Sequence, residues 1–258
     1  MSDDPLPPSS PTPAPGRPTV RTAAVIPAAG RGVRLGPGAP KALRALGGTP
    51  MLVHAVRAMA DSRAVSLVVV VAPPDGAGEV TSLLDAHALP ERTDVLVVPG
   101  GESRKESVKL GLDALPEGYD IVLVHDAARP LVPVDTVDAV IEAVRDGAPA
   151  VVPALPLADT VKQVEPAAAP GEPEPVVATP DRSTLRAVQT PQGFDRATLV
   201  RAHGTVTDDV TDDAGMVELL GLTVVTVPGH EEAFKVTRPL DLVLAEAVLA
   251  RRRLNDGF

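Results

Sequence analysis

The stretch TAAVIPAAGRGVRL, residues 22–35, passes from a β-branched apolar run into a loop of glycines and other small residues. Glycine allows positive φ angles and lets backbone amides approach a ligand closely. Arg31, Arg34 and the nearby Lys41 supply positive charge for phosphates. The stretch therefore predicts a buried strand that ends at a polyphosphate-binding loop.

The spacing of this loop excludes two better-known phosphate-binding motifs. A dinucleotide fingerprint requires G-x-G-x-x-G, but Leu35 stands where the third glycine belongs. A Walker loop requires Gly-Lys followed by Ser or Thr, whereas Lys41 lies between Pro40 and Ala42. A glycine-rich turn without a ligand remains an alternative, and Arg34 and Lys41 weigh against it.

Composition narrows the class of protein. The chain has 258 residues and a net charge of −10, which opposes a general nucleic-acid binder because such a protein needs a basic face. It has no cysteine, which excludes disulfides and thiolate chemistry and is compatible with a reducing cytoplasm. No apolar run reaches the length of a membrane span. We expect a soluble, cytoplasmic protein that binds neither nucleic acid nor membrane.

Two regions of the chain differ in their expected order. Residues 1–20 are rich in proline and serine and should form a disordered tail, whereas residues 21–258 should form a single domain.

In that domain, short β-rich runs alternate with amphipathic stretches, a pattern typical of a parallel sheet covered by helices. The predicted fold class is α/β, with a Rossmann-like open, mostly parallel sheet sandwiched by helices. Strands are predicted at residues 22–26, 65–72, 94–98, 120–124, 150–154 and 222–227. Helices are predicted at residues 50–61, 79–87, 102–115, 134–146, 214–220 and 239–252.

Residues 156–189 break this alternation. Short β-prone runs lie on both sides of a segment rich in Pro, Glu and Ala, which predicts a protruding β-arm. A long exposed hairpin is rarely ordered alone. We therefore favour a dimerisation arm, and hence a homodimer, over a mobile surface loop.

Polar motifs follow four of the predicted strands. Ligands of open α/β sheets bind beyond the carboxyl ends of the strands, so these motifs should meet at one edge. They are the loop at residues 28–41, the segment that starts at Gly100, the segment that starts at His125, and the segment that contains Lys235. Each could also be a helix cap or a solvated turn, but their coincidence favours a binding site.

Three residues of these motifs suit a nucleotide. The backbone of Gly101 and the hydroxyl of Ser107 could read a base edge, although the same segment could simply cap a helix. Asp126 could bind a ribose, a substrate hydroxyl or Mg²⁺. The alternative is a plain ion pair between Asp126 and Arg129.

The motifs together resemble one family. In order along the chain they are PAAGRGVR (27–34), PK (40–41), GGESRKESV (100–108), VHDAARP (124–130), DTVK (159–162), QTPQ (189–192) and KVTRP (235–239). This set resembles the 2-C-methyl-D-erythritol 4-phosphate cytidylyltransferases of non-mevalonate isoprenoid biosynthesis, over residues 23–250. The resemblance implies a fold of the nucleotide-diphospho-sugar transferase type.

The resemblance also implies a reaction. CMP would pass from CTP to methylerythritol phosphate with release of pyrophosphate, by in-line attack of the substrate phosphate on the α-phosphorus. Mg²⁺ would be bound with CTP. Such a reaction rests on positioning and on charge neutralisation rather than on a covalent intermediate.

The resemblance further implies roles for individual residues. Catalytic roles fall to Arg34, Lys41 and Lys235. Nucleotide binding falls to Ala28, Ala29, Gly30, Gly32, Gly101, Ser107 and Asp126, and Asp126 is also the implied metal ligand. Binding of the second substrate falls to Arg129, Thr160, Arg182, Thr190 and Thr211. If the arm joins two subunits, Thr160 and Arg182 should reach the neighbouring subunit's site.

Two alternative functions remain open, and the chain departs from the family's motifs at one position. A cytidylyltransferase for ribitol 5-phosphate would share the nucleotide loops, and a non-catalytic nucleotide-binding regulator would share the fold. The cationic residues Arg34, Lys41 and Lys235 weigh against a regulator. Many relatives carry Asn where this chain has Ala233, so Glu231 and Glu232 stay without an assigned role.

Overall fold

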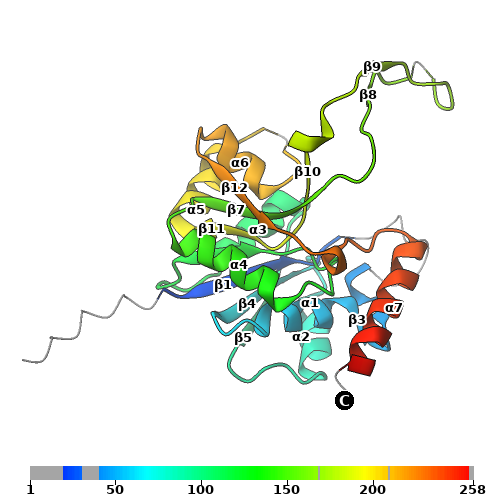
Figure 1. The fold of residues 1–258 in the computed structure, drawn as a ribbon. Coiled ribbons are helices and arrows are strands. Elements are labelled where there is room, and N and C mark those ends of the chain that lie inside the picture. The colour runs from blue at the N-terminus through cyan, green and yellow to red at the C-terminus, as the bar shows by residue number, and fades with distance from the viewer. Residues whose placement is uncertain (1–19, 31–40, 168, 209, 256–258) are drawn as a thin grey trace, which may run out of the picture.

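The computed structural model describes residues 20–30, 41–167, 169–208 and 210–255 (Figure 1). The predicted tail, apart from Val20, lies outside the described residues, as do Gly32 and Arg34. The backbone of Lys41 is described but its side chain is not.

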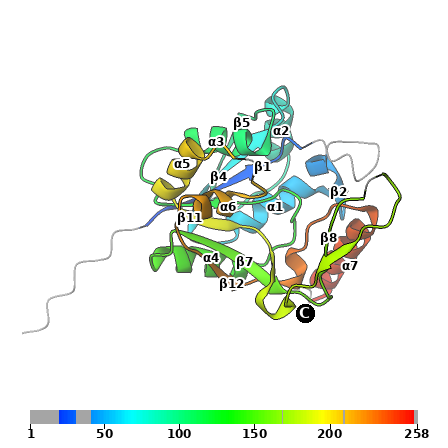
Figure 2. The ribbon, with the colours of Figure 1, turned by 90° about the horizontal axis from the view of Figure 1, so that it is seen from above.

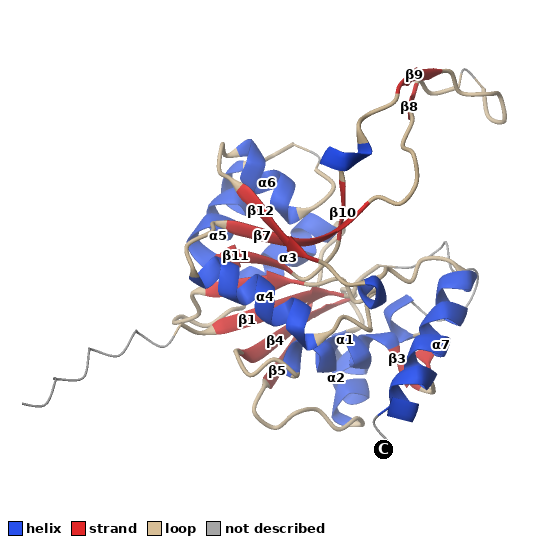
Figure 3. Cartoon of the chain, viewed as in Figure 1, coloured by secondary structure: helices blue, strands red, loops and turns tan. Residues whose placement is uncertain are grey.

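The described chain alternates strands and helices, as Figure 3 shows. The strands are β1 (Thr22–Pro27), β2 (Ala45–Leu46), β3 (Thr49–Pro50), β4 (Val65–Ala72), β5 (Asp94–Pro99), β6 (Ile121–Val124), β7 (Ala150–Pro156), β8 (Gln163–Val164), β9 (Val176–Ala178), β10 (Arg186–Val188), β11 (Gln192–Asp195) and β12 (Val224–Pro228). The helices are α1 (Met51–Ala60), α2 (Ala77–Asp85), α3 (Arg104–Asp113), α4 (Val134–Arg145), α5 (Arg196–Thr205), α6 (Asp213–Leu219) and α7 (Pro239–Asn255). Short 3-10 helices are η2 (Lys41–Leu43), η3 (Arg182–Thr184) and η4 (Glu231–Ala233).

One large sheet runs through the centre of the molecule. Its strand order is β10-β7-β11-β6-β1-β4-β5, and β12 also pairs with β7. The pairs β1–β4, β1–β6, β4–β5 and β7–β12 are parallel, whereas β11 is antiparallel to both β6 and β7. The predicted Rossmann-like, mostly parallel sheet is therefore confirmed.

Both faces of the sheet are covered by helices because the central strands are apolar on both faces. In β1, Ala23 and Val25 pack with residues of α3, α5 and α6, whereas Ala24 and Ile26 pack with residues of α1, α2 and α4. All four side chains are completely buried. The view from above shows the helices on both sides of the sheet (Figure 2).

The last helix closes a separate small core. Ala245 of α7 packs with Leu46 of β2 and with Met51 at the start of α1. Glu246 accepts a hydrogen bond of 2.8 Å from the amide of Gly47, which turns the β2–β3 hairpin with a φ of 59°. This hairpin was not predicted, because its two-residue strands are too short to show alternation.

The protruding β-arm is present, with one correction at its base. Strands β8 and β9 pair near its tip, and the arm extends away from the body of the molecule (Figure 1). The run 185–188, expected in the arm, instead supplies β10, which pairs antiparallel with β7 of the central sheet. The arm is thus rooted in the main sheet by hydrogen bonds that a sequence pattern cannot reveal.

Two elements of the central unit were not predicted. Strand β11 has the sequence QGFD, which lacks a β-branched run, and it forms because α4 packs directly over Gly193, which has no Cβ. Helix α5 follows it, capped by Asp195, which accepts a 2.8 Å bond from the amide of Thr198. Among the described helices, none is long and apolar enough to cross a membrane.

Candidate active site

A pocket of about 300 Å³ lies at the carboxyl ends of the parallel strands, where the polar motifs were expected to meet. The loops after β1, β5 and β6 contribute to it, together with Lys235 from the segment after β12. Its walls are formed by Pro27, Ala28, Ala29, Gly30, Ala42, Gly101, Glu102, Ser103, Arg104, Ser107, Asp126, Ala127, Ala128 and Lys235. We call it the first pocket.

The first pocket is built largely from backbone and small side chains. The amide of Ala28 donates to the carbonyl of Val71 at 2.8 Å, which fixes the start of the loop after β1. Gly100 lies so close to β4 that a Cβ there would be 2.7 Å from the carbonyl oxygen of Ala72. The loops on this side of the first pocket are thus held close to β4, and Gly100 is the residue that permits the approach.

The hydroxyl of Ser107 shapes the first pocket through Gly101. Ser107 is buried, and its Oγ accepts a hydrogen bond of 3.2 Å from the Gly101 amide. Ser103 caps α3 because its hydroxyl accepts a 3.1 Å hydrogen bond from the amide of Glu106. The carboxylate of Glu106 in turn accepts a hydrogen bond from the backbone amide of Glu102. The segment is therefore both a capped helix start and a pocket wall.

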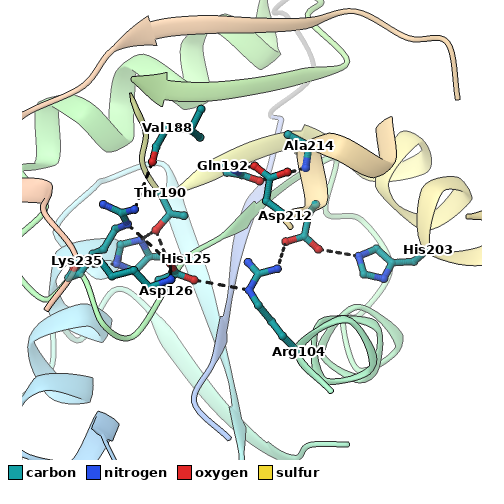
Figure 4. Close-up of polar contacts among 12 residues, drawn as sticks. Arg104, His125, Asp126, Val188, Thr190, Gln192, His203, Asp212, Ala214 and Lys235 are labelled. Carbon is teal, nitrogen blue, oxygen red and sulfur yellow. Dashed lines mark hydrogen bonds and ion pairs between the residues drawn. The ribbon is translucent and has the colours of Figure 1, made fainter. Parts of the chain in front are cut away.

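Asp126 is the centre of a cluster of three cations (Figure 4). Its carboxylate lies 2.8 Å from Lys235 Nζ and 3.7 Å from both Arg104 Nε and Arg129 Nε. Burial raises the pKa of Asp126, but Lys235 and Arg104 lower it by more, to about 2. Asp126 is therefore ionised at neutral pH, and its ion pair with Lys235 is tighter than the expected pair with Arg129.

A second pocket of about 280 Å³ adjoins the first. Its walls are formed by Arg104, Asp126, Arg129, Val188, Gln189, Thr190, Gln192, Thr211, Asp212 and Lys235. Arg104, Asp126 and Lys235 line both pockets. Two neighbouring binding spaces thus share one charged wall.

Arg104 is a site residue that the sequence analysis did not assign. It stands inside the GGESRKESV motif, so its position was visible, but its role depends on contacts far away in the chain. Its Nη1 donates to Asp213 at 2.7 Å, across 109 residues of sequence. Asp213 and Asp126 raise the pKa of Arg104 by more than burial lowers it, so the guanidinium is charged.

Thr190 of the second pocket contacts both the backbone of Asp126 and a buried histidine, His125. Nε2 of His125 lies 3.1 Å from the Arg129 carbonyl, which can only accept, so Nε2 carries the ring proton. Nδ1 then accepts from the Thr190 hydroxyl at 3.0 Å, and the same hydroxyl accepts from the Asp126 amide at 3.0 Å. Complete burial lowers the pKa of His125 to about 4, so the ring is neutral at pH 7.

Arg129 lines the second pocket and is anchored there. It donates from Nη1 to the carbonyl of Ala233 at 2.7 Å and from Nη2 to that of Val188 at 3.4 Å. The side chain of Ala233 is completely buried, so its contact with Arg129 is made by the backbone alone. Glu232 is paired with Arg251 and Arg252 of α7 and does not line either pocket.

The structure brings together most of the described residues that were predicted for the site. Ala28, Ala29, Gly30, Gly101 and Ser107 line the first pocket, Arg129, Thr190 and Thr211 line the second, and Asp126 and Lys235 line both. Thr160 and Arg182 line neither pocket. They lie on the arm, where Arg182 donates to the carbonyl of Ala158. Within one chain, these two residues are separated from the site.

The fold and the site together define a class of protein. The edge of a Rossmann-like sheet carries a phosphate-loop sequence and two joined pockets. The first pocket has walls of small residues, and a cluster of cations lies where the two pockets meet. This combination is typical of a nucleotidyltransferase. A sequence model of the family described as "IspD: 2-C-methyl-D-erythritol 4-phosphate cytidylyltransferase" matches residues 22–251. The chain belongs to this family.

Individual relatives agree with this assignment. The chain is 86% identical over 258 residues, all of both chains, to the 2-C-methyl-D-erythritol 4-phosphate cytidylyltransferase of Streptomyces avermitilis. It is 84% identical to that of Streptomyces coelicolor over 94% of this chain and 90% of the relative. The solved structure of the enzyme so named from Thermus thermophilus is 35% identical, with a TM-score of 0.67 over 87% of this chain and 97% of the other.

Proposed function

We propose that this chain carries out the reaction of its family: transfer of CMP from CTP to 2-C-methyl-D-erythritol 4-phosphate, with release of pyrophosphate, in the non-mevalonate pathway of isoprenoid biosynthesis. The product is 4-diphosphocytidyl-2-C-methyl-D-erythritol. The family match and the identities above 80% over most of the chain support this acceptor over ribitol 5-phosphate. A cytoplasmic location is part of the proposal, and the lack of cysteine is compatible with it.

The wall shared by the two pockets is the observation that carries the proposal. In-line attack requires the acceptor phosphate and the α-phosphate of CTP to approach each other closely, although both are negatively charged. The first pocket would hold CTP and the second would hold the acceptor. Arg104 and Lys235 stand between them and can neutralise both phosphates.

The cations would divide the work. Lys235 would bind the α-phosphate and orient the acceptor, because it lines both pockets. Arg34 and Lys41 would hold the triphosphate and stabilise the charge that builds on the α-phosphoryl oxygens. Ala42, next to Lys41 in η2, lines the first pocket, which supports this role for Lys41.

The residues present fit a magnesium ion that is bound mainly through the nucleotide. Mg²⁺ typically uses one or two protein carboxylates together with phosphate oxygens and water. Asp126 provides one ionised carboxylate at the first pocket, and the described residues hold no cluster of three or more His, Cys, Asp or Glu suited to a metal. We propose that Asp126 and the triphosphate of CTP hold Mg²⁺, which would withdraw negative charge from the phosphates.

A homodimer would complete the acceptor pocket. Thr160 and Arg182 lie on an arm that extends away from the pockets of its own chain (Figure 1). Val164, Val176 and Val177 of the arm are exposed and apolar, a surface suited to a protein contact. We propose that the arm joins two copies of the chain and carries Thr160 and Arg182 to the partner's acceptor phosphate.

A direct assay tests the proposed function. The purified protein is incubated with CTP, Mg²⁺ and methylerythritol phosphate, and pyrophosphate release is followed. We expect release with CTP, little with ATP, UTP or GTP, and a lower kcat/KM with ribitol 5-phosphate. Higher efficiency with ribitol phosphate would overturn the acceptor. No release with any acceptor would favour a regulator.

A further inference from the structure

The guanidinium of Arg104 has unused hydrogen-bond donors at the boundary of the two pockets. Arg104 lines both pockets, and its side chain keeps 35% of its surface exposed. Of its five N–H groups, only one makes a hydrogen bond to a described part of the chain, from Nη1 to Asp213. Its Nε is 3.7 Å from Asp126, too far for a hydrogen bond. The remaining donors are available to an anion.

Asp213 fixes Arg104 from behind. Its side chain is completely buried, and its Oδ2 accepts the 2.7 Å bond from Arg104 while its Oδ1 faces His203 Nε2 at 3.0 Å. Burial raises the pKa of Asp213, but the hydrogen bond from His203 and the charge of Arg104 lower it by more. Asp213 is thus a buried carboxylate with one donor on each oxygen.

The start of α6, which carries Asp213, is itself held in place. Asp212 caps the helix by accepting a 2.9 Å bond from the Gly215 amide. Gln192 of β11 donates to Asp212 at 2.7 Å and accepts from the Ala214 amide at 3.2 Å, as Figure 4 shows. The carboxylate of Asp213 therefore has little freedom to follow Arg104.

His203 completes this arrangement from α5. Because Asp213 is ionised and can only accept, Nε2 of His203 carries the ring proton. Nδ1 is buried and makes no hydrogen bond to the described residues. His203 lines neither of the two pockets, so it contacts the site only through Asp213.

We propose that Arg104 contacts the reacting phosphates where the two pockets meet, and that Asp213, held by His203, positions it there. This inference rests on the proposed CMP transfer. Without Asp213, Arg104 would turn towards Asp126, its nearest other carboxylate, and would pair with the group that Lys235 already contacts. Asp213 thus keeps the guanidinium free for phosphate.

Kinetics of three variants test the chain of contacts. We expect Arg104→Ala to lower kcat by about 10²-fold, with smaller changes in the two KM values, because the contact forms mainly in the transition state. Asp213→Asn keeps one accepting oxygen and turns an N–H towards one of the two donors, Arg104 or His203. We expect kcat to fall by about 10- to 100-fold, the usual size of a lost hydrogen bond to a charged group. In the Arg104→Ala background, Asp213→Asn should have no further effect on kcat.

A matched control and a rescue separate positioning from stability. Asp113→Asn removes a carboxylate from an exposed ion pair on the same helix as Arg104 and should leave kcat unchanged. His203→Gln retains an N–H near the position of Nε2 and should restore most of the activity that His203→Leu loses. Thermal unfolding of each variant reports its stability independently.

Each outcome decides the inference. If Asp213→Asn lowers kcat equally with and without Arg104, Asp213 acts by another route and the positioning role is wrong. If Asp213→Asn does not fold, the two His203 variants decide, and equal kcat in both overturns the role of His203. Full activity of Arg104→Ala overturns the phosphate contact. Failure of the proposed function is a separate result, since the unaltered protein would then release no pyrophosphate.

Discussion

The two pockets that share Arg104, Asp126 and Lys235 are built in different ways. The first is lined mainly by backbone and small side chains in three short segments, each directly after a parallel strand. The second is lined mostly by longer polar side chains. They come from α3, from the segments after β6 and β12, from the stretch that runs from the end of β10 to the start of β11, and from the residues just before α6. The first pocket follows from the strand pattern, whereas the second depends on long-range packing.

This difference separates two kinds of recognition. Small residues and exposed backbone suit the flat base and the many phosphate oxygens of a nucleotide, because amides can approach closely. A small acceptor needs a few polar groups placed at fixed positions. In this chain those groups are fixed by contacts such as Thr190–His125 and Gln192–Asp212.

The largest effect is expected where the two pockets meet. Lys235→Ala should lower kcat by about 10²–10³-fold, because it removes a cation from the wall shared by the two pockets, where we propose that the reacting phosphates meet. Steady-state kinetics with each substrate varied in turn would measure it. Arg201→Ala, an exposed arginine on α5, is the control and should behave like the unaltered protein. A near-normal kcat would remove Lys235 from the mechanism.

His125 is buried behind the second pocket, between the Arg129 carbonyl and the Thr190 hydroxyl, and its contribution to stability should depend on pH. Its pKa is about 4 when folded and 6.5 in the unfolded chain, so the unfolded chain binds a proton first as the pH falls. The free energy of unfolding should therefore decrease by about 3 kcal/mol between pH 6.5 and pH 4 through this group alone. Denaturant unfolding of the unaltered protein and of His125→Gln across this range measures the difference. The same pH dependence in both proteins would contradict the assignment.

The first pocket alone should respond to Gly100→Ala. A Cβ there would lie 2.7 Å from the Ala72 carbonyl and 3.0 Å from Ser107 Oγ, so the loop must shift. Such overpacking costs about 1–3 kcal/mol, and we expect KM for CTP to rise by about 10- to 100-fold. KM for the acceptor should change much less. Gly78→Ala, where a Cβ meets open space, is the control. An equal rise in both KM values would show that the pockets are not separate.

The smallest effect should come from the arm. Arg182→Ala should raise KM for methylerythritol phosphate by about ten-fold, the usual size of one lost hydrogen bond to a charged group, and should affect KM for CTP less. The comparison of the two KM values is the measurement. Equal changes in both would argue that Arg182 acts on the fold of the arm rather than on the acceptor.

Much of the fold was predictable because the relevant signals are local. The apolar runs at β1, β4 and β6 marked the buried strands, and polar segments after them marked the edge where the first pocket lies. Ser107 and Gly101 were found in the same way. Strand β11 was missed because its pairing depends on the packing of α4 over Gly193 rather than on its own side chains.

The sequence by itself determined the alternation of strands and helices, the apolar core and the motifs that follow the strands, because these depend on neighbours along the chain. Only the tertiary structure decided the position of Arg104, which pairs with a carboxylate 109 residues away. It likewise decided that β10 joins the arm to the central sheet and that the carbonyl of Ala233 accepts a hydrogen bond from Arg129. Charged side chains act on whichever groups the fold brings within a few ångströms, and sequence spacing does not encode that distance.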